Sequence, residues 1–151
     1  MNFCVLLWRP LHEKSVILSI RGKQTYPDQE PEIIELVTEG TLEYVDMGWD
    51  LCYEESALTG LEGVTTHFSI RGDTITLTRT GKIHSEMVFK KGIVHNSLYE
   101  LEFGALMLSV CATELNYQLS DCGGQINLVY NIDIEQTTAG QIEYHLDIHS
   151  T

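Results

Sequence analysis

The chain has 151 residues, of which 43% are hydrophobic, and this suits one domain with a substantial core. Its 22 acidic and 9 basic residues give a formal net charge of −13, which argues against nucleic acid and anionic membrane surfaces as partners. Cys4, Cys52, Cys111 and Cys122 show no C-x-x-C pair and no zinc spacing, so we expect free thiols in a reducing cytoplasm.

The N-terminus carries a short apolar run from Phe3 to Trp8. No basic segment precedes the run, and Arg9 and Pro10 follow it in place of small residues. It is therefore a poor signal peptide, and it is far too short to span a bilayer. We expect residues 1–14 to form an apolar arm or extension and residues 15–151 to form a single domain.

Alternation of apolar and polar residues dominates the rest of the chain, with turn signals about every 8–12 residues, as in antiparallel β proteins. The first three predicted strands are Ser15–Gly22, Glu32–Val45 and Trp49–Glu55. Gly40 lies in the middle of the second strand and predicts a bend or bulge there. A single helical turn fits the following loop, residues 56–63.

The next two strands form a short hairpin around Gly72 and Asp73. A two-residue loop with glycine first is typical of a type II′ turn. This loop places Ile70 opposite Ile75 and Thr66 opposite Arg79. Because alternate residues share a face, Arg79 lies on the same face as the apolar side chains of its strand.

Further strands are predicted at residues 83–89, 93–103 and 141–149, with two long strands within residues 104–135. Gly123 and Gly124 are the predicted loop of a long hairpin, which would place Leu119 opposite Leu128. The apolar residues before this loop change phase near Ala112–Glu114, and a bulge there would keep both sets on one face.

These elements add up to about ten strands joined mostly by short connections. Short connections require antiparallel neighbours, and a long meander leaves two free edges unless it closes. The sequence therefore predicts an all-β protein, an antiparallel up-and-down β-barrel of about 8–10 strands.

Six segments follow one another along the chain: IELVTEGTLEYV, LCYEES, FSIRGDTITLTRTG, MVFKKG, YELEFGALMLSV and GGQINLVYNIDI. Their combination resembles the YwiB-like family of bacterial proteins, from about Ser15 to His149, most recognisably at Arg79-Thr80-Gly81 and Met87-Val88-Phe89. That family is described as a calycin-like β-barrel with no assigned function. The resemblance therefore implies this fold and a bacterial, cytoplasmic setting, and it supplies no catalytic residues.

A candidate ligand site follows from the side chains that strand alternation turns inward. Arg79 stays charged inside a barrel and needs a partner. Tyrosines with apolar rings and polar tips share the inward faces: Tyr53, Tyr99, Tyr117, Tyr130 and Tyr144. Such a set could bind the carboxylate or phosphate of a small amphipathic anion, as lipocalins and fatty-acid-binding proteins among the calycins do. The alternative is that Arg79 reaches solvent at the rim or pairs with a structural carboxylate such as Glu100.

A weaker candidate is a metal site at the C-terminus. His145, Asp147 and His149 form the pattern H-x-D-x-H, which places three potential ligands on one face of a strand. The alternative is an ordinary solvated face, and we treat Asp50, Cys52 and Glu54 as outward-facing in the same way.

No catalytic motif is present in the sequence. There is no G-x-S-x-G, no H-E-x-x-H and no glycine-rich phosphate loop, so we expect a binding protein without a cofactor rather than an enzyme. The competing hypothesis is a structural or interaction barrel with a filled interior, for which the apolar run Phe3–Trp8 would provide a surface for a partner or for a homodimer.

Overall fold

The computed structural model describes residues 13–151, apart from the side chains of Thr138 and Ala139. It consists of ten strands and one turn of 3₁₀ helix. Their bounds are β1 (Glu13–Thr25), β2 (Glu32–Val45), β3 (Gly48–Glu54), η1 (Ala57–Thr59), β4 (Val64–Arg71), β5 (Thr74–Gly81), β6 (His84–Lys90), β7 (Val94–Leu101), β8 (Gly104–Ser120), β9 (Gly123–Ile134) and β10 (Thr137–Ser150).

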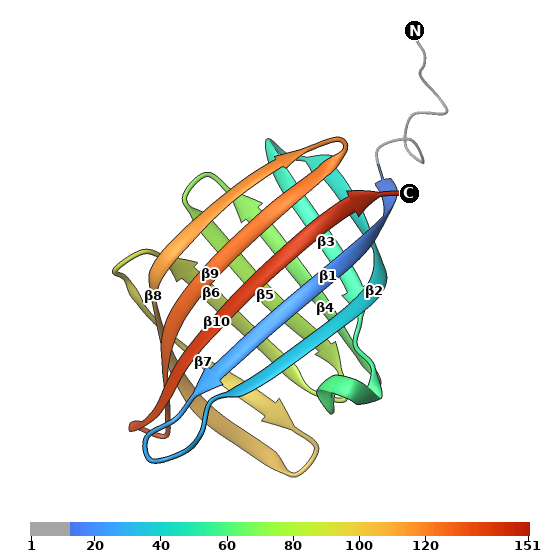
Figure 1. The fold of residues 1–151 in the computed structure, drawn as a ribbon. Helices are drawn as coiled ribbons and strands as arrows, with labels where there is room; N and C mark the ends of the chain where they lie inside the picture. Colours follow the sequence, from blue (N-terminus) through green and yellow to red (C-terminus); the bar gives the residue numbers. More distant parts are fainter. Residues whose placement is uncertain (1–12) are drawn as a thin grey trace, which may run out of the picture.

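The ten strands form a closed antiparallel barrel, as the alternation predicted (Figure 1). Each strand pairs with the next one along the chain, and β1 closes the barrel by pairing with β10. Because the barrel is closed, every strand has two neighbours, although β6 and β7 pair only at His84–Glu100 and Ser85–Tyr99. No helix in residues 13–151 has the length and hydropathy needed to cross a membrane.

The first strand is longer at both ends than the sequence predicted. β1 begins at Glu13, so Glu13 and Lys14 pair with β2 and belong to the barrel rather than to an N-terminal arm. The rest of the predicted arm, residues 1–12, lies outside the described residues. β1 ends at Thr25, because Lys23 and Gln24 continue the ladders with both β2 and β10 and Thr25 still pairs with Gln141 of β10.

The predicted position of the loop in the long β8–β9 hairpin is wrong. Asp121 and Cys122 form the turn, and Gly123 and Gly124 are the first residues of β9, so Leu119 faces Gly124. A Cβ on Gly124 would lie 1.9 Å from the carbonyl oxygen of Gln118, so this glycine is required by close backbone contact rather than by the turn. The register moves by an even number of residues, and the inward face stays as predicted.

Two other local predictions are confirmed. Ile70 pairs with Ile75 and Thr66 with Arg79 across the β4–β5 turn, where Gly72 has a positive φ of 59°. The β8–β9 ladder shifts register between Ala112 and Glu114, at the predicted bulge. Both features follow from local sequence, namely glycine in a tight turn and a change of apolar phase.

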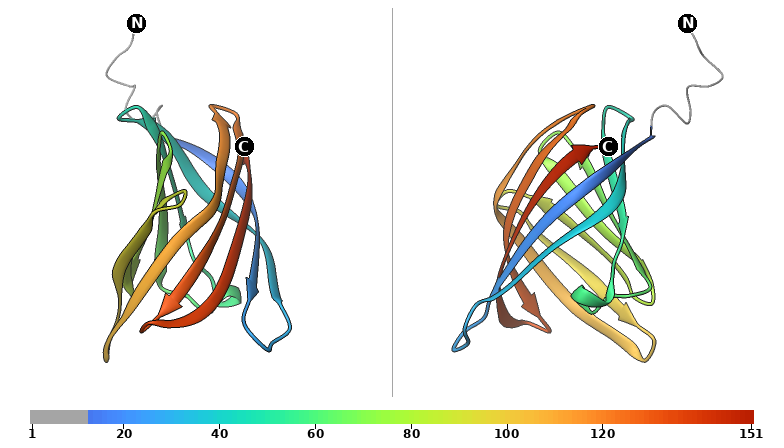
Figure 2. Two further views of the ribbon diagram at one scale, coloured as in Figure 1. Left: turned by 90° about the vertical axis from the view of Figure 1, so that its left-hand side faces the viewer. Right: turned by 45° about the vertical axis from the view of Figure 1, so that its right-hand side comes forward.

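The two ends of the barrel differ in how their interiors are filled. At the end that contains the β4–β5 turn, Ile70, Ile75 and Phe89 are fully buried beside that turn. The opposite end contains the β1–β2 loop and η1 (Figures 1 and 2). In residues 13–151, the buried polar side chains are Glu55, Thr66, Arg79 and Ser85, and they lie towards this second end.

Candidate ligand-binding site

A cavity of about 320 Å³ lies inside the barrel at the end near η1. Its apolar walls come from both halves of the chain, including Ile20, Leu36, Leu108, Ile132 and Ile142. Its polar walls are formed by Gln24, Tyr26, Tyr53, Glu55, Thr59, Arg79, Tyr99, Tyr130 and Tyr144. Four of the five predicted tyrosines, together with Arg79, therefore line one cavity.

The polar wall is organised as one row of directly paired residues on β3 to β7. Tyr53 pairs with Thr66, Thr66 with Arg79, Arg79 with Ser85, and Ser85 with Tyr99. Directly paired residues point to the same face of a sheet, so all five side chains turn inward along one row that crosses five strands.

Arg79 is the charged member of this row. Its side chain is only 8% exposed, and its Nη2 donates a hydrogen bond of 2.9 Å to the hydroxyl of Tyr144. Among the described residues, its buried Nε has no hydrogen-bond partner. Burial lowers the pKa of Arg79, but the surrounding Tyr144, Tyr130, Tyr53 and Glu55 outweigh it, so the net shift is upward and the guanidinium stays charged.

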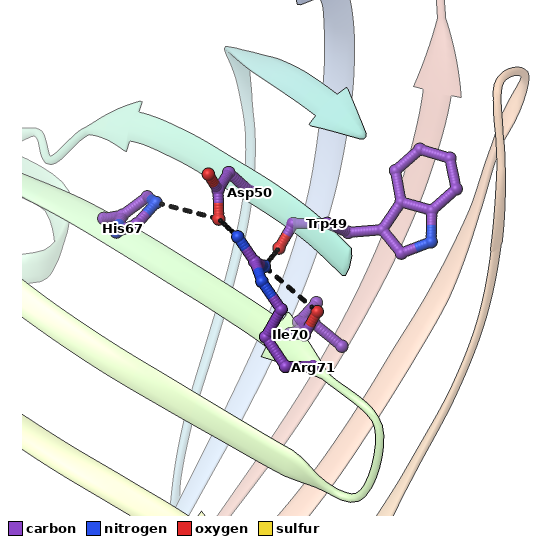
Figure 3. Close-up of polar contacts among 5 residues, drawn as sticks. All are labelled: Trp49, Asp50, His67, Ile70 and Arg71. Atoms are coloured by element: carbon purple, nitrogen blue, oxygen red, sulfur yellow. Dashed lines mark hydrogen bonds and ion pairs between the residues drawn. The ribbon is translucent and has the colours of Figure 1, made fainter. Parts of the chain in front are cut away.

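Arg71, on the neighbouring strand β4, is an arginine whose guanidinium has several protein partners, and it serves as a comparison for Arg79 (Figure 3). Its Nη1 donates to the carbonyl oxygens of Trp49 and Ile70 at 3.1 and 3.2 Å, and its Nη2 lies 3.1 Å from Asp50 Oδ1. His67 Nε2 approaches the same carboxylate oxygen at 3.6 Å. Arg71 is thus held by three groups, whereas Arg79 has one.

Glu55 is a site residue that sequence reasoning did not select. It follows β3, is 9% exposed, and accepts hydrogen bonds from the hydroxyls of Thr59, at 3.0 Å, and Thr66. The sequence signal was available, because Glu55 has the same parity as Tyr53 and therefore the same inward face. The sequence analysis also did not select Tyr26, which lies in the β1–β2 loop and lines the cavity.

Tyr53 and Tyr130 supply hydroxyl donors that remain protonated at neutral pH. Burial raises the pKa of Tyr53 and Tyr130 well above the usual value of 10. Desolvation is the main cause in both cases, because the charged phenolate loses its hydration inside the barrel. Together with Arg79, these groups can donate several hydrogen bonds to one acceptor.

Tyr117 does not lie with the other predicted site residues. Its hydroxyl donates a 2.8 Å hydrogen bond to the carbonyl oxygen of Gly72, in the turn at the opposite end of the barrel. Glu100, the carboxylate considered as a partner for Arg79, is exposed, and none of the ion pairs in residues 13–151 joins it to Arg79. Alternation gives the face of a residue correctly but not its depth along the barrel axis.

The predicted metal ligands do not form a metal site in the described residues. No group of three His, Cys, Asp or Glu side chains within residues 13–151 is placed to hold an ion. His145 Nε2 lies 3.1 Å from Asp147 and its Nδ1 bonds Asn127, while His149 is exposed. These side chains belong to the outer face of β10.

The comparisons with known proteins identify the fold and a family. The crystal structure of the ywiB protein from Bacillus subtilis matches with a TM-score of 0.81 and 19% sequence identity, over 93% of this chain and 94% of that one. At this identity the likeness shows the fold alone. No curated protein matches the sequence. The family model described as a domain of unknown function (DUF1934) matches residues 18–148, nearly the whole barrel, and the chain therefore belongs to the DUF1934 family.

Proposed function

We propose that this protein binds a small amphipathic anion inside its barrel. The observation that carries the proposal is Arg79, a buried and charged side chain with an unpartnered Nε, in the wall of a cavity. Buried polar groups that lack a partner cost about 1–3 kcal/mol, and more when they are charged. An anionic group bound at Arg79 would remove that cost.

The residues that line the cavity and its volume support an amphipathic rather than a purely polar ligand. Donors gather at Arg79, Tyr53, Tyr130 and Tyr144, while aliphatic side chains such as Ile20, Leu36 and Ile142 form the apolar walls. A volume of about 320 Å³ is at the lower end of the range typical of small-molecule sites. A short-chain carboxylate fits this description.

The architecture supports the same proposal. Closed up-and-down barrels such as lipocalins enclose single small ligands, and we propose that this barrel is calycin-like in this sense. We also propose a cytoplasmic setting, because Cys52, Cys111 and Cys122 are free thiols in the described residues. The competing hypothesis of a structural barrel requires a filled interior, and the cavity favours ligand binding over it.

The test is calorimetric titration of octanoate into the native protein and into Arg79→Gln. Hydrogen bonds to charged groups contribute about 1.5–3 kcal/mol, so we expect Arg79→Gln to weaken binding by about 10- to 150-fold. Arg21→Gln is the matched control, because it removes the same charge from an exposed side chain of β1. Thermal unfolding of both variants shows that they are folded.

The proposal fails if the native protein binds neither octanoate nor longer saturated carboxylates. It also fails if Arg79→Gln and Arg21→Gln bind octanoate equally well. Native mass spectrometry of protein isolated from cells adds an independent check, because a retained small anion is expected in the native protein and not in Arg79→Gln.

A further inference from the structure

The interior of the barrel contains two charged side chains of opposite sign. Glu55 and Arg79 are the charged residues that are buried in the described part of the chain. They come from opposite sides of β4, since Glu55 follows β3 and Arg79 lies on β5. Each could have neutralised the other directly.

The two side chains do not form an ion pair. Within residues 13–151, no contact of 4.0 Å or less joins a nitrogen of Arg79 to an oxygen of Glu55. Thr66, which pairs with Arg79 across the strands, donates its hydroxyl to Glu55 instead. The negative charge is therefore fixed near Arg79 but leaves its Nε unpartnered.

We propose that Glu55 limits the bound head group to a single negative charge, so that the site accepts monocarboxylates and rejects dianionic phosphates. This inference depends on the proposed binding function. With Arg79 and Glu55 both charged, the empty interior is formally neutral, and a monoanion leaves it with one net negative charge. A dianion leaves it with two, in a buried place where charges are poorly screened.

The hydrogen-bond pattern supports the role of Glu55 as a fixed charge rather than as a direct ligand contact. Both of its oxygens already accept from hydroxyls, Oε1 from Thr59 and Oε2 from Thr66. These bonds hold the carboxylate in place when a ligand enters. Arg79, by contrast, keeps donors available on the cavity wall.

The test compares three eight-carbon probes: octanoate, octyl phosphate and octan-1-ol. Measured at pH 8, well above the second pKa of a phosphate at about 6, octyl phosphate carries two charges. We expect the native protein to bind octanoate at least tenfold more tightly than octyl phosphate and more tightly than octan-1-ol. In Glu55→Gln, which keeps the size of the side chain, the preference over octyl phosphate should shrink at least fivefold.

Glu54→Gln is the matched control, because it removes the same charge from the adjacent residue, whose exposed carboxylate bonds Thr65 outside the barrel. It should leave the preference unchanged. Equal or tighter binding of octyl phosphate or octan-1-ol by the native protein overturns the inference, as does a preference that Glu55→Gln and Glu54→Gln change equally. These outcomes leave the binding site itself intact, whereas failure to bind octanoate at all overturns the proposed function.

Discussion

At the scale of single residues, the hydrogen bond between Arg79 and Tyr144 joins the stability of the barrel to its proposed function. The bond brings together β5 and β10, which are 65 residues apart in the sequence. It is the contact that fixes the guanidinium in the cavity wall. Removing it should therefore affect both unfolding and ligand binding.

Tyr144→Phe tests this double role. The variant leaves a buried guanidinium donor without its acceptor, so we expect the free energy of unfolding to fall by about 1.5–3 kcal/mol, measured by urea denaturation. Octanoate binding should weaken as well. Tyr117→Phe is the control, because its hydroxyl bonds Gly72 far from the cavity and its loss should leave octanoate binding unchanged. Equal effects of the two variants on binding would contradict the placement of the site.

The buried tyrosines predict a loss of stability at high pH. The unfolded chain releases the protons of Tyr53 and Tyr130 above pH 10, their ordinary pKa, whereas burial keeps them bound in the folded state. The folded state then binds more protons, so the free energy of unfolding falls as the pH rises above 10. Each tyrosine contributes up to about 1.4 kcal/mol per pH unit.

Thermal unfolding of native protein, Tyr130→Phe and Tyr44→Phe between about pH 8 and 11 measures this effect. The decline above pH 10 should be shallower in Tyr130→Phe than in the native protein. Tyr44 is exposed, so Tyr44→Phe should follow the native curve. A decline that is the same in all three proteins would show that Tyr130 does not contribute.

Sequence reasoning found Arg79 but assigned its surroundings incompletely. Parity placed Arg79 beside Ile75 and Leu77 on the inward face, and the structure agrees. It could not place Tyr117 along the barrel axis, because depth depends on strand register and stagger. Glu55 was overlooked because it stands where the strand ends, although its parity was correct.

At the scale of elements, replacing either of two strand glycines by alanine should change the stability of the barrel in opposite directions. A Cβ on Gly40 of β2 would lie 2.6 Å from the backbone oxygen of Cys52 and 3.2 Å from Cβ of Tyr53. A Cβ on Gly22 of β1 would meet only a ring carbon of Tyr144, at an ordinary 3.9 Å. Neither glycine has a positive φ, so space alone distinguishes them.

Gly40→Ala should therefore lower the free energy of unfolding by about 1–3 kcal/mol, because β2 must move away from β3. Gly22→Ala should be neutral or stabilising by up to about 1 kcal/mol, since alanine loses less backbone entropy on folding. Urea unfolding of the two variants measures the difference. Similar stabilities would contradict the close packing of β2 against β3.

The long β8–β9 hairpin shows why register was harder to predict than face. Two adjacent glycines usually indicate a tight turn, but Gly123 and Gly124 are needed where neighbouring backbones come close, to Ile148 on β10 and Gln118 on β8. That contact involves two different neighbouring strands, so no local pattern reveals it. The inward face was still correct, because an even shift preserves alternation.

At the scale of the whole molecule, the barrel is packed at one end and hollow at the other. Fully buried Phe68, Ile70 and Phe89 fill the interior towards the β4–β5 turn, and the cavity lies towards η1. The closed fold was predictable, because alternation over ten short-linked segments leaves few other arrangements. The cavity could not be predicted in the same way, because its volume depends on how the side chains of all ten strands pack in the interior.

The most direct measurement of the central claim is the ¹⁵N–¹H NMR signal of Arg79 Nε–H during titration with octanoate. Loss of the signal in Arg79→Gln assigns it, and Arg71, held on the outer face by Asp50, provides an internal reference. We expect the Arg79 signal to move as octanoate saturates the protein while the Arg71 signal stays in place. A saturated complex in which the Arg79 signal does not move would contradict it.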